Sequence, residues 1–272
     1  MRDSARAGTP RIVLMTVEGS GLEPAVPVVP RDRRPRRQVS VVGVTGELLI
    51  TGGVLVLLFL GWQLWLQDIL VGGAQDAQAQ KLGQQWQQSG PTTPPPSTGP
   101  GDPVVRKAPG NAKVFGLLIV PRWGKHWERK IAQGTGVNDV LDAIGVGHYP
   151  GTQMPGEVGN FAIAAHRHAY GGGFEYVHEL HVGDNIYVET KDGWYQYSFR
   201  DIQYVQPTEV NVLQPVPMRP GVKPTDRILT MTTCNPFFST AERMIGYALF
   251  DAWYPRADGP PHQIAATVKA EG

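Results

Sequence analysis

An uncharged apolar stretch at residues 48–66 constrains this chain most, and it contains a single amide, Gln63. As a helix these nineteen residues would reach about 28 Å, close to the ~30 Å of a bilayer's hydrocarbon core. Trp62 and Trp65 stand at its C-terminal end, where indole rings favour the membrane interface. The sequence therefore predicts one transmembrane helix, at residues 41–66.

The flanking residues distinguish a membrane anchor from a signal peptide or a buried core helix. The stretch is long for a signal peptide, and no clear cleavage site follows closely, although residues 72–74 leave that alternative open. An Arg-rich run at residues 31–37 precedes the stretch, and Lys81 is the single base among residues 67–103. Because basic residues collect on the cytoplasmic side, we expect a single-pass protein of the cell membrane with its N-terminus inside. A nucleic-acid patch is the weaker interpretation of the Arg run.

Composition divides the rest of the chain. The 33 Gly and 24 Pro make about 21% of the 272 residues, against ~12% on average. Residues 1–38 are predicted to be a disordered, basic cytoplasmic tail, and residues 67–110 a Gln- and Pro-rich extracellular linker whose start extends the helix for a few turns. A folded domain is expected at residues 111–258, followed by a C-terminal tail at residues 259–272.

The folded domain is predicted to be mainly β, because short β-rich runs alternate with Gly, Pro, Asn and Asp. We expect few and short helices around a closed barrel or a sandwich. The expected strands are 114–120, 160–166, 185–190, 196–205, 228–234 and 244–253, and the expected helices are 137–144, capped by Thr135 or Asn138, and 174–180.

Charge and cysteine content exclude several classes of function. Residues 104–272 carry sixteen basic and sixteen acidic side chains, so we expect no nucleic-acid partner. Cys234 is the single cysteine, which excludes an internal disulfide and a zinc site built from several thiolates. The sequence has no calcium-loop, phosphate-loop or His-Glu-x-x-His motif, so we expect neither a cofactor nor a metal.

A thiol, an imidazole and a guanidinium stand at the ends of predicted strands. Cys234 ends one strand directly before Asn235-Pro236, Arg243 follows nine residues later, and His166 ends another strand. If these strands are neighbours, the three groups support acyl transfer. The thiolate attacks a carbonyl, the imidazolium protonates the leaving amine, and the guanidinium stabilises the oxyanion.

Each of these residues also has a simpler interpretation. A free cysteine at the end of an apolar strand is most often buried, and Arg243 by itself is a solvated charge paired with a nearby acid. His168 competes with His166, because it would lie on the same strand face if the strand continued. The Gly run at residues 171–173 indicates instead that a loop has begun.

The motifs together resemble a sortase over residues 112–255. They are TMTTC with an Arg nine residues on, an upstream AAHRHAYGGGF, and a later Gly-Asp before a strand. Within the sortases the chain is similar to class E, the actinobacterial housekeeping type. The TTCNP signature, the HYPGTQMPGEVGNFAIAAHR stretch and the N-terminal anchor carry that similarity.

The resemblance implies a sortase-type β-barrel that acts as a cysteine transpeptidase. The Cys234 thiol would cleave a Leu-Ala-x-Thr-Gly-like C-terminal sorting signal between Thr and Gly and hold the protein as a thioester. The amine of a peptidoglycan precursor such as lipid II would then receive the protein. His166 and Arg243 match the other catalytic positions. Tyr149 matches an aromatic residue that selects Ala over Pro in the signal, and Thr232 and Thr233 are implied in substrate binding.

One departure from the family and two other functions stay open. Ala165 stands where many relatives have Gly, and its methyl group would matter if that position needs a positive φ. A pilin-polymerising sortase would use a Lys side chain as acceptor, but such enzymes commonly carry a lid and a second, C-terminal membrane segment. A membrane-tethered β-domain that binds a cell-wall partner without catalysis is the third possibility.

Overall fold

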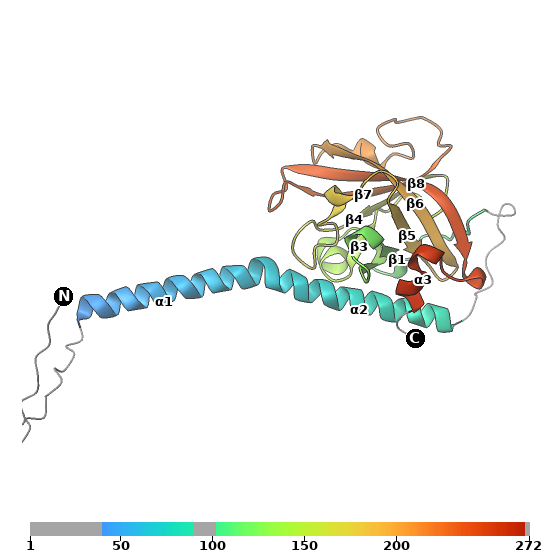
Figure 1. Cartoon of the computed structure of the whole chain (residues 1–272). Coiled ribbons are helices and arrows are strands. Elements are labelled where there is room, and N and C mark those ends of the chain that lie inside the picture. The colour runs from blue at the N-terminus through green and yellow to red at the C-terminus, as the bar shows by residue number, and fades with distance from the viewer. Residues whose placement is uncertain (1–39, 90–101, 270–272) are drawn as a thin grey trace, which may run out of the picture. The chain divides into compact units, whose positions relative to one another are not determined.

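The computed structural model describes residues 40–89 and 102–269 (Figure 1). The predicted tail at residues 1–38 lies outside the described residues, as does the part of the predicted linker at residues 90–101. Three helical segments come first along the chain: α1 (Val41–Gly61), a turn of π-helix η1 (Trp62–Leu66) and α2 (Gln67–Gln88).

α1 has the length and composition of a membrane span. It has 21 residues and a mean hydropathy of 2.1, and none of its apolar window is buried in protein. Among the described residues it is the one helix that is both long and apolar enough to cross a bilayer. The regular α-helix ends at Gly61, so Trp62 lies in the π-helical turn that follows.

Within the described residues, eight strands form a closed barrel (Figure 1). They are β1 (Val114–Ile119), β2 (Glu128–Gln133), β3 (Gly145–His148), β4 (Gly159–Ala164), β5 (Asn185–Glu189), β6 (Gly193–Val205), β7 (Arg227–Asn235) and β8 (Glu242–Pro255). Their order around the barrel is β1-β2-β3-β4-β7-β8-β6-β5, and β5 pairs with β1 to close it. β2 pairs with β3, and β4 with β7, in parallel; the other neighbours are antiparallel.

The helices between and after the strands are short. They are η2 (Pro121–Trp123), η3 (Val137–Leu141), η4 (Val177–Glu179), η5 (Val210–Leu213), η6 (Arg256–Asp258) and α3 (His262–Lys269). The expected helix at residues 137–144 is therefore only the π-helical turn η3, and its N-cap is Gly136 instead of Thr135 or Asn138. A mainly β barrel with few short helices is confirmed.

Six strands lie where the β-rich runs predict them, whereas β2 and β3 were not expected. β2 begins with three charged residues, and its Glu128 and Arg129 are buried because α2 covers them. Asp76 of α2 accepts a hydrogen bond from the Glu128 amide at 2.8 Å and pairs with Arg129. β3 contains Gly147, where a Cβ would lie 2.3 Å from the Gly134 carbonyl oxygen, so close backbone approach excludes a side chain.

α2 extends for 22 residues and packs on the barrel. Its buried residues follow helical spacing: Gly72, Gln75, Ala79, Gly83 and Trp86. Ala79 and Trp86 form a hydrophobic cluster with Leu117 of β1. Small residues let the helix approach closely, since a Cβ at Gly83 would already lie 3.3 Å from the Leu117 side chain.

One face of β7 packs into the barrel interior, so only the other face is available for chemistry. Leu229 and Met231 of β7 are fully buried in the main hydrophobic core. Because side chains alternate along a strand, Thr233 points the same way as these two, and Thr232 and Cys234 point away from the core. The thiol of Cys234 is therefore on the outer side of the barrel wall, where it is partly exposed.

Candidate active site

The strand register places Cys234 directly opposite Arg243. β7 and β8 are antiparallel, and Cys234 pairs with Arg243 one step before the connection between the strands. Residues opposite each other in an antiparallel pair have side chains on one face, with Cβ atoms about 5 Å apart. The Arg243 Nη1 donates to the carbonyl oxygens of Thr240 and Glu242, both at 3.0 Å, which holds the guanidinium at this end of the strands.

His166 reaches the same end of the barrel from β4, the parallel neighbour of β7. Ala164 pairs with Thr232, and the Ala165 amide still donates to the Thr232 carbonyl at 3.3 Å. His166 and Cys234 each lie two residues beyond that pair, so they lie at the same level at the ends of the two strands. The three predicted catalytic residues therefore gather at the ends of three neighbouring strands, β4, β7 and β8.

Asp142 is a fourth member of this site that the sequence analysis missed. Its Oδ1 lies 2.7 Å from His166 Nε2, and the two side chains are 17% and 24% exposed. Asp142 directly follows η3 and is 24 residues before His166 in the chain, and the pairing of β3 with β4 brings the two together. Because the carboxylate engages Nε2, the Nδ1 atom is the ring nitrogen left for another partner.

Tyr149 and Thr232 lie together on the face of β7 that carries the thiol. Tyr149 Oη is 2.8 Å from Thr232 Oγ1, and Thr232 is two residues before Cys234 on the same face. Thr233 is different, because its side chain points inward and is only 3% exposed as a residue. Its Oγ1 donates to the Ala165 carbonyl at 2.9 Å, which links β7 to the segment that carries His166.

A buried histidine supports the turn that follows Tyr149. His148 is fully buried, with Nδ1 2.7 Å from the side-chain oxygen Oε1 of Gln133 and Nε2 2.9 Å from both the Gln153 carbonyl oxygen and Thr152 Oγ1. Burial lowers the pKa of His148 to about 4, so the ring is neutral at physiological pH. Its role is structural.

His168, the competing histidine, lies outside the strand register. Its Nδ1 is 3.1 Å from the Asp68 carboxylate of α2, and its ring packs on Phe237 and Phe238 at centroid distances of 4.9 and 4.5 Å. This geometry favours His166 as the residue beside the thiol.

A polar network that the sequence did not reveal fixes the turn after Cys234. Arg167 donates to the Asn235 side-chain oxygen, and the Asn235 amide nitrogen donates to Glu242 at 2.8 Å. The Asn235-Pro236 peptide bond is cis. These contacts join the segment after His166 to both strands that carry the thiol and the guanidinium.

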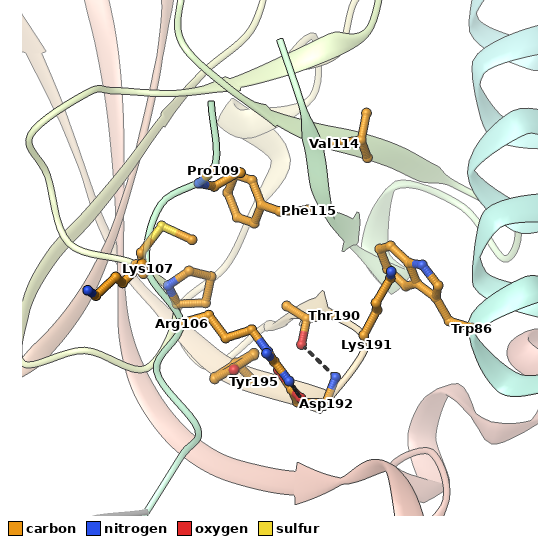
Figure 2. A pocket seen from close by; sticks show the side chains of 12 residues that line it. Trp86, Arg106, Lys107, Pro109, Val114, Phe115, Thr190, Lys191, Asp192 and Tyr195 are labelled. Atoms are coloured by element: carbon orange, nitrogen blue, oxygen red, sulfur yellow. Dashed lines mark hydrogen bonds and ion pairs between the residues drawn. The ribbon is translucent and has the colours of Figure 1, made fainter. Parts of the chain in front are cut away.

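Figure 2 shows a cavity, with a volume of about 470 Å³. It is lined by Tyr195, near the start of β6, whereas Arg243 pairs with Val205 at the other end of that strand. Trp86 projects into it from α2, and the charged part of the lining consists of Lys107, Lys191 and the ion pair between Arg106 and Asp192. None of the predicted site residues lines it. The described residues also contain no group of three or more His, Cys, Asp or Glu side chains arranged for a metal ion.

The sequence and the fold are both similar to those of known proteins. A family model described as the sortase domain matches residues 118–250. Sortase SrtE2 of Streptomyces coelicolor is 32% identical over 225 residues, which cover 78% of this chain and 83% of that protein. The chain belongs to the sortase family. Sortase SrtE1 of the same organism is 35% identical over 245 residues, 87% of this chain, and the chain spans only 64% of its length.

Solved sortase structures show the same fold. SrtA sortase from Actinomyces oris is 39% identical, with a TM-score of 0.55 over 63% of this chain and 94% of its own. Sortase E1 from S. coelicolor, solved with a tripeptide in its active site, is 38% identical, with a TM-score of 0.52 over 58% of this chain and 98% of its own. The predicted resemblance to class E sortases is confirmed.

Proposed function

We propose that this sortase is a membrane-anchored cysteine transpeptidase that uses Cys234 as nucleophile, His166 as acid and base, and Arg243 as oxyanion stabiliser. The strand register carries the proposal. It brings a partly exposed thiol opposite a guanidinium and in step with an imidazole whose Nε2 is held by Asp142. Asp142 acts through His166 and is a positioning residue.

The reaction proceeds in two acyl transfers. The Cys234 thiolate attacks the carbonyl carbon of the threonine in a Thr-Gly bond, and Arg243 stabilises the negative charge on the carbonyl oxygen. The new C–S bond remains as the C–N bond breaks, and His166 gives its proton to the departing glycine amine. An acceptor amine then attacks the thioester, returns a proton to His166 and releases Cys234.

The substrate is a C-terminal sorting signal similar to Leu-Ala-x-Thr-Gly, and the acceptor is the amine of a peptidoglycan precursor. Tyr149 is supported as a contact for the signal because its hydroxyl lies on Thr232, on the face that carries the thiol. Thr233 contributes through its link to Ala165 and keeps the His166 segment beside β7. In this proposal α1 anchors the chain with the barrel outside the cell, as the Arg run before the span indicates.

Intact-mass spectrometry of the detergent-solubilised full chain tests this function. The protein is incubated with a Leu-Ala-x-Thr-Gly peptide, with and without a primary amine, and the Cys234→Ala variant is the control. We expect an acyl adduct on the wild-type protein alone, with the mass of the peptide up to Thr, and an amine-ligated peptide when acceptor is present.

The outcomes separate the possible functions. A peptide with Pro in place of Ala distinguishes a wrong signal from a lack of chemistry. No adduct with either peptide would refute the transpeptidase and support a non-catalytic binding domain. Ligation to a Lys side chain in preference to the precursor amine would indicate pilin polymerisation.

A further inference from the structure

The loop after the candidate catalytic histidine is held by α2, the helix next to the apolar span. The Asp68 carboxylate accepts hydrogen bonds from the backbone amides of Ala169 at 2.8 Å and Gly171 at 3.3 Å. It also lies 3.1 Å from His168 Nδ1, and both side chains are less than 15% exposed. One carboxylate of α2 therefore accepts hydrogen bonds from two backbone amides of the segment that follows His166, and it lies beside the ring of His168.

A second residue of α2 holds the opposite edge of the same loop. Gln75 is 5% exposed, and its Nε2 donates to the Tyr170 carbonyl at 3.0 Å. The next carbonyl, that of Gly171, accepts from Arg129 Nη2 at 3.2 Å, and Arg129 is paired with Asp76 of α2. The loop backbone is thus bound on its amides and on its carbonyls by groups that α2 supplies or fixes.

The loop needs such support because its backbone is strained. Ala169, Tyr170, Gly171 and Gly172 have φ values of 71°, 50°, 88° and 50°, four consecutive residues in the left-handed region. Glycine adopts this region freely, whereas alanine and tyrosine do not. Strained residues persist only where their surroundings hold them. Two amides of this run, those of Ala169 and Gly171, donate to the Asp68 carboxylate and so help to hold the strained backbone.

Tyr170 connects this loop to the chemistry. Its ring lies 5.4 Å from the His166 ring, with an interplanar angle of 33°. The Phe174 amide also donates to the His166 carbonyl at 2.9 Å, so the loop returns to the residue at which it began. The conformation that α2 imposes therefore determines what packs against the side of the imidazole.

We propose that α2 is a positioning element of the active site, and that Asp68 and Gln75 hold loop 167–173 so that Tyr170 keeps His166 oriented between Asp142 and Cys234. The proposal rests on the transpeptidase function above. In this proposal the helix after the membrane span is part of the catalytic unit. A simple tether would instead only hold the barrel near the membrane.

Substitutions in the full chain test the proposal. The test variants are Asp68→Asn, Asp68→Ala and Gln75→Ala. Gln78→Ala is the matched control, because Gln78 belongs to the same helix and accepts from Lys130 of β2 at 2.7 Å without touching the loop. Two experiments are done on each variant. The first gives kcat and KM for transpeptidation of a Leu-Ala-x-Thr-Gly peptide, and the second measures hydrogen exchange of the backbone amides of residues 166–174.

We expect kcat to fall about tenfold in Asp68→Ala and Gln75→Ala and less in Asp68→Asn, with KM within twofold of wild type. Exchange in loop 167–173 should accelerate in the same order, and Gln78→Ala should match the wild type in both measurements. If Asp68→Ala fails to fold, as a melting curve would show, the neutral Gln75→Ala substitution carries the same comparison.

Faster loop exchange with an unchanged kcat would overturn the positioning role, and so would unchanged exchange in every variant. An equal loss in Gln78→Ala would mean that α2 only stabilises the barrel. An inactive wild-type protein would instead refute the transpeptidase function. In that case the exchange measurement would still decide whether α2 holds the loop.

Discussion

Substitution of Asp142 tests the geometry of the active site most directly. Asp142→Asn keeps an oxygen that can accept from His166 Nε2 at the 2.7 Å now observed, but it removes the negative charge. A hydrogen bond to a charged group contributes about 1.5–3 kcal/mol. Because both side chains are about one-fifth exposed, we use the lower part of that range, about 1.5–2 kcal/mol.

At about 1.4 kcal/mol for each factor of ten, this loss lowers kcat by about 10- to 30-fold. Asp142→Ala also removes the orienting contact and should lower kcat further. The assay is the steady-state rate of transpeptidation of a Leu-Ala-x-Thr-Gly peptide, with KM determined separately. KM should change little, because Asp142 touches His166 and is not proposed to contact the peptide.

Asp139→Asn is the matched control for this experiment. Asp139 lies on the same turn, η3, but its carboxylate is exposed and accepts from Asn111 at 2.6 Å instead of from His166. It should keep wild-type turnover. An Asp142→Asn enzyme within twofold of wild type, or an equal loss in both variants, would refute the role given to Asp142.

Three further results are expected. Arg243→Lys should lower kcat about 100-fold or more, because an ammonium cannot present the planar donors of the guanidinium. Tm should not change, since the hydrogen bonds of Arg243 seen in the described residues go to the carbonyl oxygens of Thr240 and Glu242. Near-normal turnover would remove Arg243 from the site. Tyr149→Phe removes a hydrogen bond from the buried Thr232 side chain, which should lower the free energy of unfolding in urea by about 1 kcal/mol. It should also change the ratio of kcat/KM between signals with Ala and signals with Pro. An unchanged ratio would exclude Tyr149 from signal selection. The pKa of His148 is about 4 in the folded protein, below its unfolded value of 6.5. The contribution of His148 to the free energy of unfolding is therefore fully present above pH 6.5 and should fall by about 3 kcal/mol as the pH drops to 4. His148→Gln should reduce this pH dependence in urea titrations at pH 7 and pH 4.

The contrast between predicted and missed strands shows how far the sequence pattern reaches. β7 was expected because its β-branched and apolar residues satisfy strand pairing and core packing together. β2 was missed because Glu128 and Arg129 are buried by α2, and that partner comes from a distant part of the chain. β3 was missed because Gly147 is required by a close backbone approach, which only the assembled barrel creates.

The residues of the candidate site also fall into those that local motifs predict and those that only long-range contacts reveal. Cys234, Arg243 and His166 were found because each stands at a strand end and belongs to a recognisable local motif. Asp142 and Asp68 carry no such motif. Asp142 reaches His166 across 24 residues, and Asp68 reaches Ala169 across 101, through contacts that sheet pairing and helix packing make.

By itself the sequence determined the apolar span, the mainly β domain and the three residues proposed to carry the chemistry. These follow from local composition, from the alternation of side chains along strands and from short motifs. Only the tertiary structure decided which face of β7 is available, so that Thr232 lies beside Tyr149 while Thr233 points inward. It also decided which carboxylates support the histidine segment, because those contacts depend on how strands and helices distant in the chain pack together.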